Sequence, residues 1–169
     1  MCGLHCINAL LQGPYFDEGT LSEIAIALDK EEAELLGGEA NLEFKNVAPD
    51  GNYNIQVLSK ALKQFGEIEV VPFYSKENQD INMTEEQGFI CHNGDHWVAI
   101  RKVNGIWYNV NSTCVLPPGP QTISDFMLDA IMAQVKENGF DIFIIRPPQG
   151  KKLPEPDVNK PPLRQCQTY

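Results

Sequence analysis

Hydrophobic residues recur at helical spacing through the first third of the chain, and this spacing predicts two helices before residue 40. The first is expected over His5–Gln12, in register with an apolar stripe of Leu4, Ile7, Leu10 and Leu11. Cys2 would then lie at the N-terminal mouth of this helix, with Gly13-Pro14 after its end. A capping box, Thr20-Leu-Ser-Glu23, predicts a second helix that runs to about Leu36 before Gly37-Gly38.

A third helix is expected between Ile55 and Phe65. Its apolar stripe must face a core or a partner, and it consists of Ile55, Leu58, Leu62 and Phe65. The segment before it, Glu39–Asn52, is polar and is expected to be irregular.

Short apolar runs separated by turn signals predict strands in the second half. We expect strands at Glu69–Phe73 and Gly88–Cys91, followed by a turn at Asn93-Gly94. Helical spacing returns from Ile123 and ends before Gly139, and Phe140–Ile145 predicts a last strand. Helices that precede a mostly antiparallel sheet indicate an α+β fold.

A β-hairpin is the most specific local prediction. His96–Val103 and Ile106–Asn111 flank Asn104-Gly105, a strong signal for a two-residue turn. Such a turn pairs Val103 with Ile106 and Val98 with Asn111. Since side chains alternate between faces, His96 shares the face of Val98 and becomes the diagonal neighbour of Asn111, unless a bulge shifts the register.

The chain is expected to form one domain followed by a tail. Its 169 residues and 43% hydrophobic content suit a single core, which we assign to residues 1–146. From Pro147 onward the chain holds half of its prolines and almost nothing to bury, so 147–169 is expected to be a disordered tail.

Composition narrows the class of partner and the compartment. The net charge of −10 disfavours nucleic-acid binding and makes a protein partner more natural. No apolar run is long enough to cross a bilayer, and five cysteines without a regular framework favour a reducing compartment. We expect an intracellular monomer with no membrane contact.

Cys2, His96 and Asn111 together have the chemistry of a cysteine hydrolase. A helix N-terminus and a nearby imidazolium both favour the thiolate form of a cysteine. His96 would take the thiol proton and later protonate the leaving amine, while the Asn111 side chain would hold the imidazole in place. The backbone N–H of Cys2 is a candidate donor to the developing oxyanion.

Two plainer explanations compete with this reading. Free cysteines more often pack as small hydrophobes, an interpretation that suits Cys6 well, and His5 would cap or pack. Cys2-Gly-Leu-His5-Cys6 and Cys91-His92 resemble zinc ligands only superficially, because paired C-x₂₋₄-C knuckles are missing. We therefore expect no metal and no cofactor.

Four linked motifs resemble a known family. They are Cys2-Gly-Leu-His-Cys-Ile-Asn-Ala-Leu-Leu-Gln-Gly13, Asn54-Ile-Gln-Val-Leu-Ser59, Asp95-His-Trp97 and Trp107-Tyr-Asn-Val-Asn-Ser112. In this order they resemble the Josephin domain of deubiquitinating cysteine proteases, ataxin type, over roughly residues 1–146. The resemblance implies a papain-like fold, a helical arm and hydrolysis of ubiquitin linkages in the nucleus, the cytoplasm or both, with ubiquitin and polyubiquitin conjugates as partners.

The resemblance also assigns roles to individual residues. Cys2 matches the nucleophile, His96 the base and Asn111 the orienting residue. Ubiquitin-contact surfaces map onto Ile55, Gln56 and Phe65, with a second patch at Tyr15 and Phe16; all five could instead be core residues.

The chain departs from the family pattern ahead of the nucleophile. The family carries there a glutamine that donates to the oxyanion hole, whereas this sequence starts at Met1. We expect a deubiquitinase; because loss of this donor would lower the rate, the alternative is a catalytically weak or inactive ubiquitin-binding module of the same fold. A papain-like hydrolase of ordinary peptides is a third hypothesis.

Overall fold

The structure is a computed structural model that describes residues 2–37, 53–78, 80–94, 96–111 and 121–163. Within these ranges the chain forms four α-helices: α1 (Cys2–Leu11), α2 (Glu18–Leu35), α3 (Ile55–Gly66) and α4 (Asp125–Glu137). It also forms six strands: β1 (Glu69–Pro72), β2 (Gly88–Asn93), β3 (His96–Val103), β4 (Ile106–Asn109), β5 (Gln121–Ile123) and β6 (Asp141–Arg146). Two single 3₁₀ turns, Lys76–Asn78 and Met83–Glu85, lie between β1 and β2.

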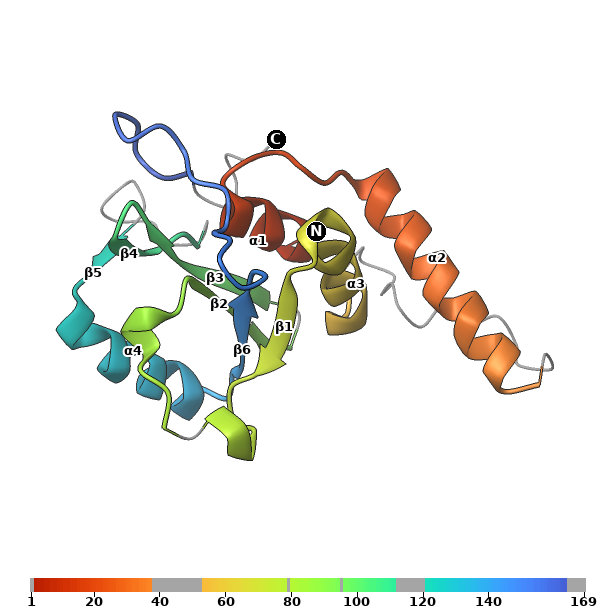
Figure 1. Cartoon of the computed structure of the whole chain (residues 1–169). Helices are drawn as coiled ribbons and strands as arrows, with labels where there is room; N and C mark the ends of the chain where they lie inside the picture. The colour runs from red at the N-terminus through yellow and green to blue at the C-terminus, as the bar shows by residue number, and fades with distance from the viewer. Residues whose placement is uncertain (1, 38–52, 79, 95, 112–120, 164–169) are drawn as a thin grey trace.

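The strands form one open sheet in the order β1-β6-β2-β3-β4-β5, and all of the pairs between described strands are antiparallel. α1 and α3 cover one face of the sheet, and α4 covers the other (Figure 1). The predicted α+β class, with helices on a mostly antiparallel sheet, is confirmed.

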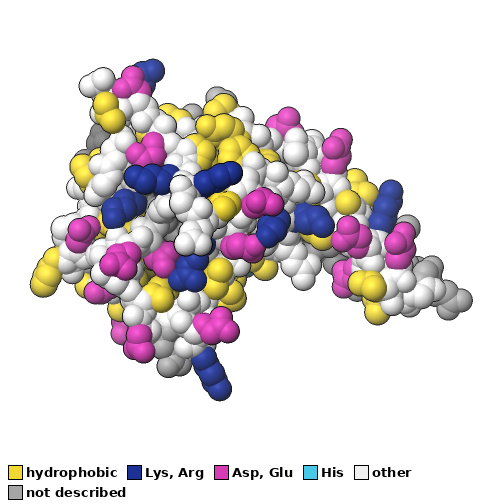
Figure 2. All heavy atoms as spheres, viewed as in Figure 1, with side chains coloured by type: hydrophobic (Ala, Val, Ile, Leu, Met, Phe, Trp, Pro, Cys, Tyr) yellow, Lys and Arg dark blue, Asp and Glu magenta, His cyan; other side chains and the backbone are white. Residues whose placement is uncertain are grey.

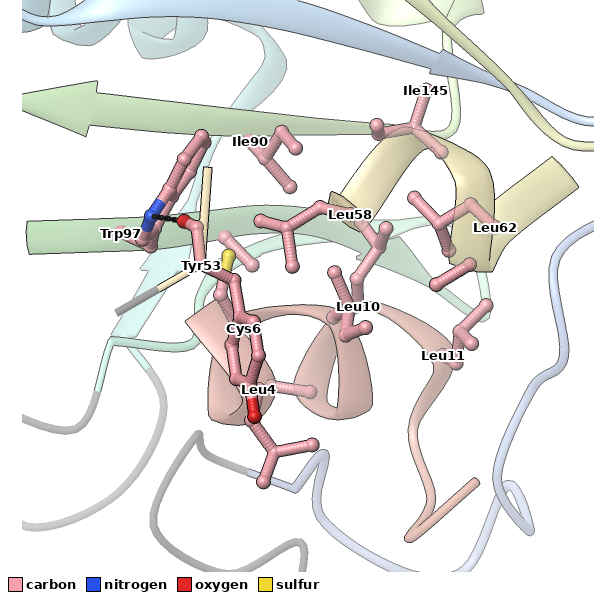
Figure 3. Close-up of a cluster of buried hydrophobic side chains, with 14 of the residues drawn as sticks. Leu4, Cys6, Leu10, Leu11, Tyr53, Leu58, Leu62, Ile90, Trp97 and Ile145 are labelled. Atoms are coloured by element: carbon pink, nitrogen blue, oxygen red, sulfur yellow. Dashed lines mark hydrogen bonds between the residues drawn. The ribbon is translucent and has the colours of Figure 1, made fainter. Parts of the chain in front are cut away.

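The larger core lies between α1, α3 and the sheet (Figure 3). α1 is almost entirely buried, because both its apolar stripe and the small side chains beside it are covered by β3 and α3. The Nε1–H of Trp97 donates to the backbone oxygen of Tyr53 at 3.1 Å, which satisfies the polar atom of a fully buried indole. This bond ties the start of β3 to the segment that leads into α3.

Two helix starts differ from the predicted ones. α1 begins at Cys2, three residues before His5, so the thiol lies in the first turn of the helix. α2 begins at Glu18 because Asp17 caps it: the Asp17 carboxylate accepts the Thr20 N–H at 2.7 Å. The capping box at Thr20 was therefore the wrong choice of start. α3 begins where predicted, with Asn54 accepting the Val57 N–H.

The predicted hairpin register is confirmed where β3 and β4 pair, whereas the predicted pair of Val98 with Asn111 lies beyond the end of β4. Val103 pairs with Ile106 and Ile100 pairs with Asn109, around a turn in which Asn104 and Gly105 both have positive φ. β4 ends at Asn109, two residues before the predicted end. The short strand β5 was not predicted from the sequence.

The C-terminal segment differs from the expected tail over residues 147–163. Leu153 is 2% exposed and joins the core of α1, and Pro162 is also buried. In Figure 1 this segment passes from β6 over the end of α1 toward the β3–β4 turn. The expectation that it buries almost nothing was wrong, because hydrogen bonds to distant side chains hold the extended chain in place.

α2 projects from the body as an arm (Figure 1). Its base is fixed where the Tyr53 hydroxyl lies 3.1 Å from the Ser22 hydroxyl and donates to the Glu18 oxygen at 3.2 Å. At the far end Leu35 and Leu36 are exposed, and Figure 2 shows acidic side chains spread over this face of the arm and body. The prediction that Glu39–Asn52 is irregular lies outside the described residues. None of the described helices is both long and apolar enough to cross a bilayer.

Candidate active site

The candidate nucleophile lies at one end of the sheet, where α1 and β3 both begin. A Cβ atom on Gly3 would stand 3.4 Å from Cδ1 of Trp97, so these two residues are in contact. At the other end of the helix the Leu10 backbone oxygen accepts a bond from Arg101 at 2.9 Å. α1 therefore runs alongside β3 in the same direction, and Cys2 and His96 each precede the contact between Gly3 and Trp97.

Strand alternation assigns each residue at the start of β3 to one face of the sheet. Trp97 and Ala99 face α1, whereas Val98 and Ile100 pack with the core under α4. Alternation assigns His96 to the second face. His96 is half-buried and is the first residue of β3, at the same end of the sheet as Cys2.

Asn111 lies just beyond the described end of β4. The last bond of the ladder joins the Val110 N–H to the Ala99 oxygen at 3.2 Å, which keeps the hairpin register up to the residue before Asn111. The Asn111 N–H then donates to the Asn109 side chain at 3.0 Å. Asn111 is half-buried and lies two residues beyond the end of β4.

The three described cysteines differ in access to solvent. Cys6 and Cys91 are buried, whereas Cys2 is half-buried. Burial raises the pKa of the Cys6 thiol well above its usual range and that of Cys91 to about 12, so both are neutral and inert at physiological pH. Among these three thiols, Cys2 is the one that is partly exposed and lies in the first turn of a helix.

His5 lies one turn from Cys2 and is half-buried. Burial lowers the pKa of its imidazole, so its neutral form is favoured in the folded chain. Among the described residues, no three His, Cys, Asp or Glu side chains gather into a group that could hold a metal ion.

An aromatic patch, formed by Tyr15, Phe16 and Phe65, lies between α1 and α3. The Phe65 ring centroid is 4.9 Å from that of Tyr15 and 5.8 Å from that of Phe16. Tyr15 is 50% exposed and Phe65 is 37% exposed, so the patch is a surface rather than core. These residues were predicted as contact residues for ubiquitin, and the alternative that they are core does not hold for the two exposed rings.

A polar residue inside α1 holds this patch. The Asn8 side chain donates to the Phe16 oxygen at 2.8 Å and accepts the Phe16 N–H at 2.9 Å. Sequence reasoning missed Asn8, although a lone amide among apolar helix positions is a signal for such a bond. One helix thus carries both the candidate nucleophile and the anchor of the aromatic patch.

The other two predicted contact residues line a separate groove. Ile55 and Gln56 lie at the start of α3 and border a cavity of about 470 Å³ that α2, β1 and β6 complete. Its lining is mainly apolar side chains together with Lys60 and Lys63. The five residues predicted from the resemblance therefore fall on two surfaces, one on each side of α3.

His92 was missed as a neighbour of the site. Its ring stacks on Trp97, with centroids 4.0 Å apart and planes inclined by 24°. Trp97 is therefore held between Gly3 and His92. The sequence gives no local signal for this, because the pairing of His92 with Trp97 depends on the register of β2 with β3.

Comparisons with known proteins agree with this architecture. Residues 1–146 match the Josephin family. The chain is 40% identical over 159 residues to an ataxin-3 homolog of Arabidopsis thaliana, which covers 86% of this chain and 55% of that relative. It is 37% identical over 158 residues to human ataxin-3, covering 86% and 43%, and 30% identical over 152 residues to an ataxin-3 homolog of Caenorhabditis elegans, covering 86% and 46%.

The chain thus spans about half the length of the curated relatives it matches. Its open antiparallel sheet with helices on both faces is consistent with the papain-like fold that the sequence motifs implied. With a family match over residues 1–146 and relatives of this identity, the chain belongs to the Josephin family, which is of the deubiquitinase type.

Proposed function

We propose that this chain is a thiol-dependent hydrolase of the peptide and isopeptide bonds at the C-terminus of ubiquitin. The observation that carries the proposal is the position of Cys2 in the first turn of α1, at the end of the sheet where His96 begins β3. Membership of a deubiquitinase-type family supports the substrate class.

In the proposed reaction His96 takes the Cys2 proton, and the thiolate attacks the carbonyl carbon at the ubiquitin C-terminus. A C–S bond forms and the carbonyl electron pair moves to oxygen, where the backbone N–H of Cys2 is the candidate donor. The oxyanion then collapses, the C–N bond breaks, and the amine leaves with the proton from His96. Asn111 orients the imidazole throughout.

The resulting thioester is hydrolysed in the second half of the cycle. His96 deprotonates a water molecule that attacks the thioester carbonyl, and the C–S bond breaks to release the ubiquitin carboxylate. Cys2 leaves as the thiolate and takes back the proton held by His96, which restores the starting pair, while the carboxylic acid formed loses its own proton to solvent.

Ubiquitin is proposed to bind through the aromatic patch and through the groove at Ile55 and Gln56. Exposed aromatic rings and a mainly apolar groove are the kinds of surface that bind a folded protein rather than a nucleic acid. We propose that the chain acts as a monomer, without a metal or cofactor. The buried free thiols fit a reducing compartment, the cytoplasm or the nucleus.

A ubiquitin-binding module without chemistry is the second candidate, since the two surfaces are independent of Cys2. The two candidates differ in turnover of a ubiquitin–lysine conjugate by the parent chain and by Cys2→Ala. The hydrolase requires turnover by the parent and none by Cys2→Ala, with similar ubiquitin affinity in both. Absence of turnover in a folded parent that binds ubiquitin would favour the module, and cleavage of short peptides at equal efficiency would favour a general peptidase.

A further inference from the structure

The segment 151–163, called the strap here, is fixed to the body by side chains that recognise its backbone. The Gln87 side chain accepts the Leu153 N–H at 2.8 Å and donates to the Lys151 oxygen at 3.4 Å. Leu153 itself packs beside Leu10, over Gly88, where a Cβ atom would stand 2.9 Å from Leu10 Cδ1 and 3.6 Å from Leu153 Cδ1. The strap is therefore in contact with the C-terminal end of α1.

Gln12 makes a second paired contact just after that end. Its side chain accepts the Leu163 N–H at 2.8 Å and donates to the Leu163 oxygen at 3.0 Å and the Ala9 oxygen at 2.6 Å. Gln12 has φ of 59°, a left-handed conformation that glycine or asparagine adopts more readily. Gln12 keeps this unfavourable conformation while its side-chain amide binds both the helix and the strap. We infer that the side chain is there to join these two elements.

Arg101 joins the same two elements from inside the core. Its guanidinium donates to the Leu10 oxygen at 2.9 Å and to the Pro154 oxygen at 2.7 Å, and its side chain is only 1% exposed. Burial lowers its pKa to about 10 while Glu155, at 3.9 Å, opposes the shift, so the group stays charged at neutral pH. One buried cation thus satisfies both the last turn of α1 and the strap.

The opposite end of α1 carries Cys2. The helix is a rigid unit of ten residues whose first turn rests on Trp97 and whose last turn is bound by Arg101 and Gln12. If the contacts at the last turn are lost, the helix is free to slide or tilt on β3. Such a movement would change where the thiol stands relative to the start of β3.

We propose that Arg101 is a positioning residue for Cys2, and that the strap, by completing the shell around Arg101, keeps α1 in the register that the reaction needs. The inference rests on the proposed function only in taking Cys2 as the nucleophile. It extends the functional unit through Leu163, beyond the 1–146 match.

The test uses full-length variants that release the strap in different ways. Leu153→Asp removes its apolar anchor, and Gln12→Gly removes one clamp while relieving the left-handed backbone. Val158→Asp is the matched control, because Val158 lies on the strap and is 74% exposed. Arg101→Lys keeps the charge in a smaller group with fewer donors.

Three readouts are needed: hydrogen exchange of the α1 amides, the rate of Cys2 alkylation, and kcat and KM on a ubiquitin–lysine conjugate. We expect Leu153→Asp, which loses an apolar anchor, and Gln12→Gly, which loses three side-chain hydrogen bonds, to speed α1 exchange by about tenfold or more. Cys2 alkylation and kcat should fall with little change in KM, and Val158→Asp should match the parent.

Two results overturn the proposal. One is α1 exchange that stays at the parent rate in both release variants. The other is faster exchange with unchanged Cys2 alkylation, which would make the strap a stabilising element alone. If the parent does not hydrolyse the conjugate, the proposed function fails. Hydrogen exchange and Cys2 alkylation still decide whether the strap positions Cys2. If Leu153→Asp does not fold, Arg101→Lys takes its place, and the same three readouts are measured on it.

Discussion

Gly3 lies against the indole of Trp97, close enough that a Cβ atom on Gly3 would stand 3.4 Å from Trp97 Cδ1 and 3.6 Å from Leu58. The contact sets the spacing between the first turn of α1, which carries Cys2, and β3. It is the feature that brings the start of the helix to the start of the strand.

Substitutions at Gly3 should show that the contact with Trp97 accepts one methyl group but not a larger side chain. Gly3→Ala makes ordinary van der Waals contact and should raise the free energy of unfolding by up to about 1 kcal/mol through helix propensity. Gly3→Val overfills the contact and should lower it by about 1–3 kcal/mol. Urea unfolding measures both, and equal stabilities would contradict the contact.

Reactivity of Cys2 should depend on His96. If the imidazole takes the thiol proton, alkylation by iodoacetamide remains fast below neutral pH in the parent and becomes slow in His96→Ala. Peptide mapping assigns the adduct, and Cys2→Ala supplies the blank for the other thiols. Identical pH profiles for the parent and His96→Ala would refute the pairing of these two residues.

Ubiquitin affinity should depend on Phe65 and not on exposed aromatic rings in general. Phe65→Glu places a charge in the aromatic patch and should weaken binding by tenfold or more, about the effect of losing an interface hot spot. Phe126→Glu is the matched control, because Phe126 is 90% exposed on α4, across the sheet. Calorimetric titration of both variants, with their Tm values checked, gives the comparison; similar losses in both would count against the patch.

His5 should make the protein less stable in mild acid. Its pKa in the folded chain lies below the ordinary 6.5, so the unfolded chain takes up the proton first as the pH falls. The free energy of unfolding therefore decreases as the pH drops below about 6.5, and it is unaffected by this group well above that value. Denaturant curves from about pH 7 to about pH 5 should fall less steeply for His5→Gln than for the parent; parallel curves would contradict the assignment.

Much of the fold was predictable because its signals are local. The Asn104-Gly105 turn fixed the hairpin register, and the apolar spacing from Ile55 located α3 within a residue. The start of α2 was predicted at Thr20, but the helix begins earlier because the Asp17 carboxylate accepts the Thr20 N–H. β5 was missed because it has three residues, paired among the described strands with β4, and so short a segment carries no period of its own.

The strap could not be predicted for a related reason. Leu153 stands alone among prolines and charged residues, and its partners Leu10 and Gly88 lie far away in the sequence. At the site, the hairpin predicted the relation of His96 to Asn111, but their relation to Cys2 depends on how α1 packs on β3. That packing is a tertiary contact between Gly3 and Trp97, and no local sequence pattern encodes it.

The most direct test of the account is covalent capture by a ubiquitin that carries a C-terminal electrophile, read by intact mass on the parent and on Cys2→Ala. If Cys2 is the nucleophile, a single adduct forms on the parent, located at Cys2, and none forms on Cys2→Ala. No adduct on a folded parent that still binds ubiquitin, or an equal adduct on Cys2→Ala, would contradict the assignment of Cys2 as the nucleophile.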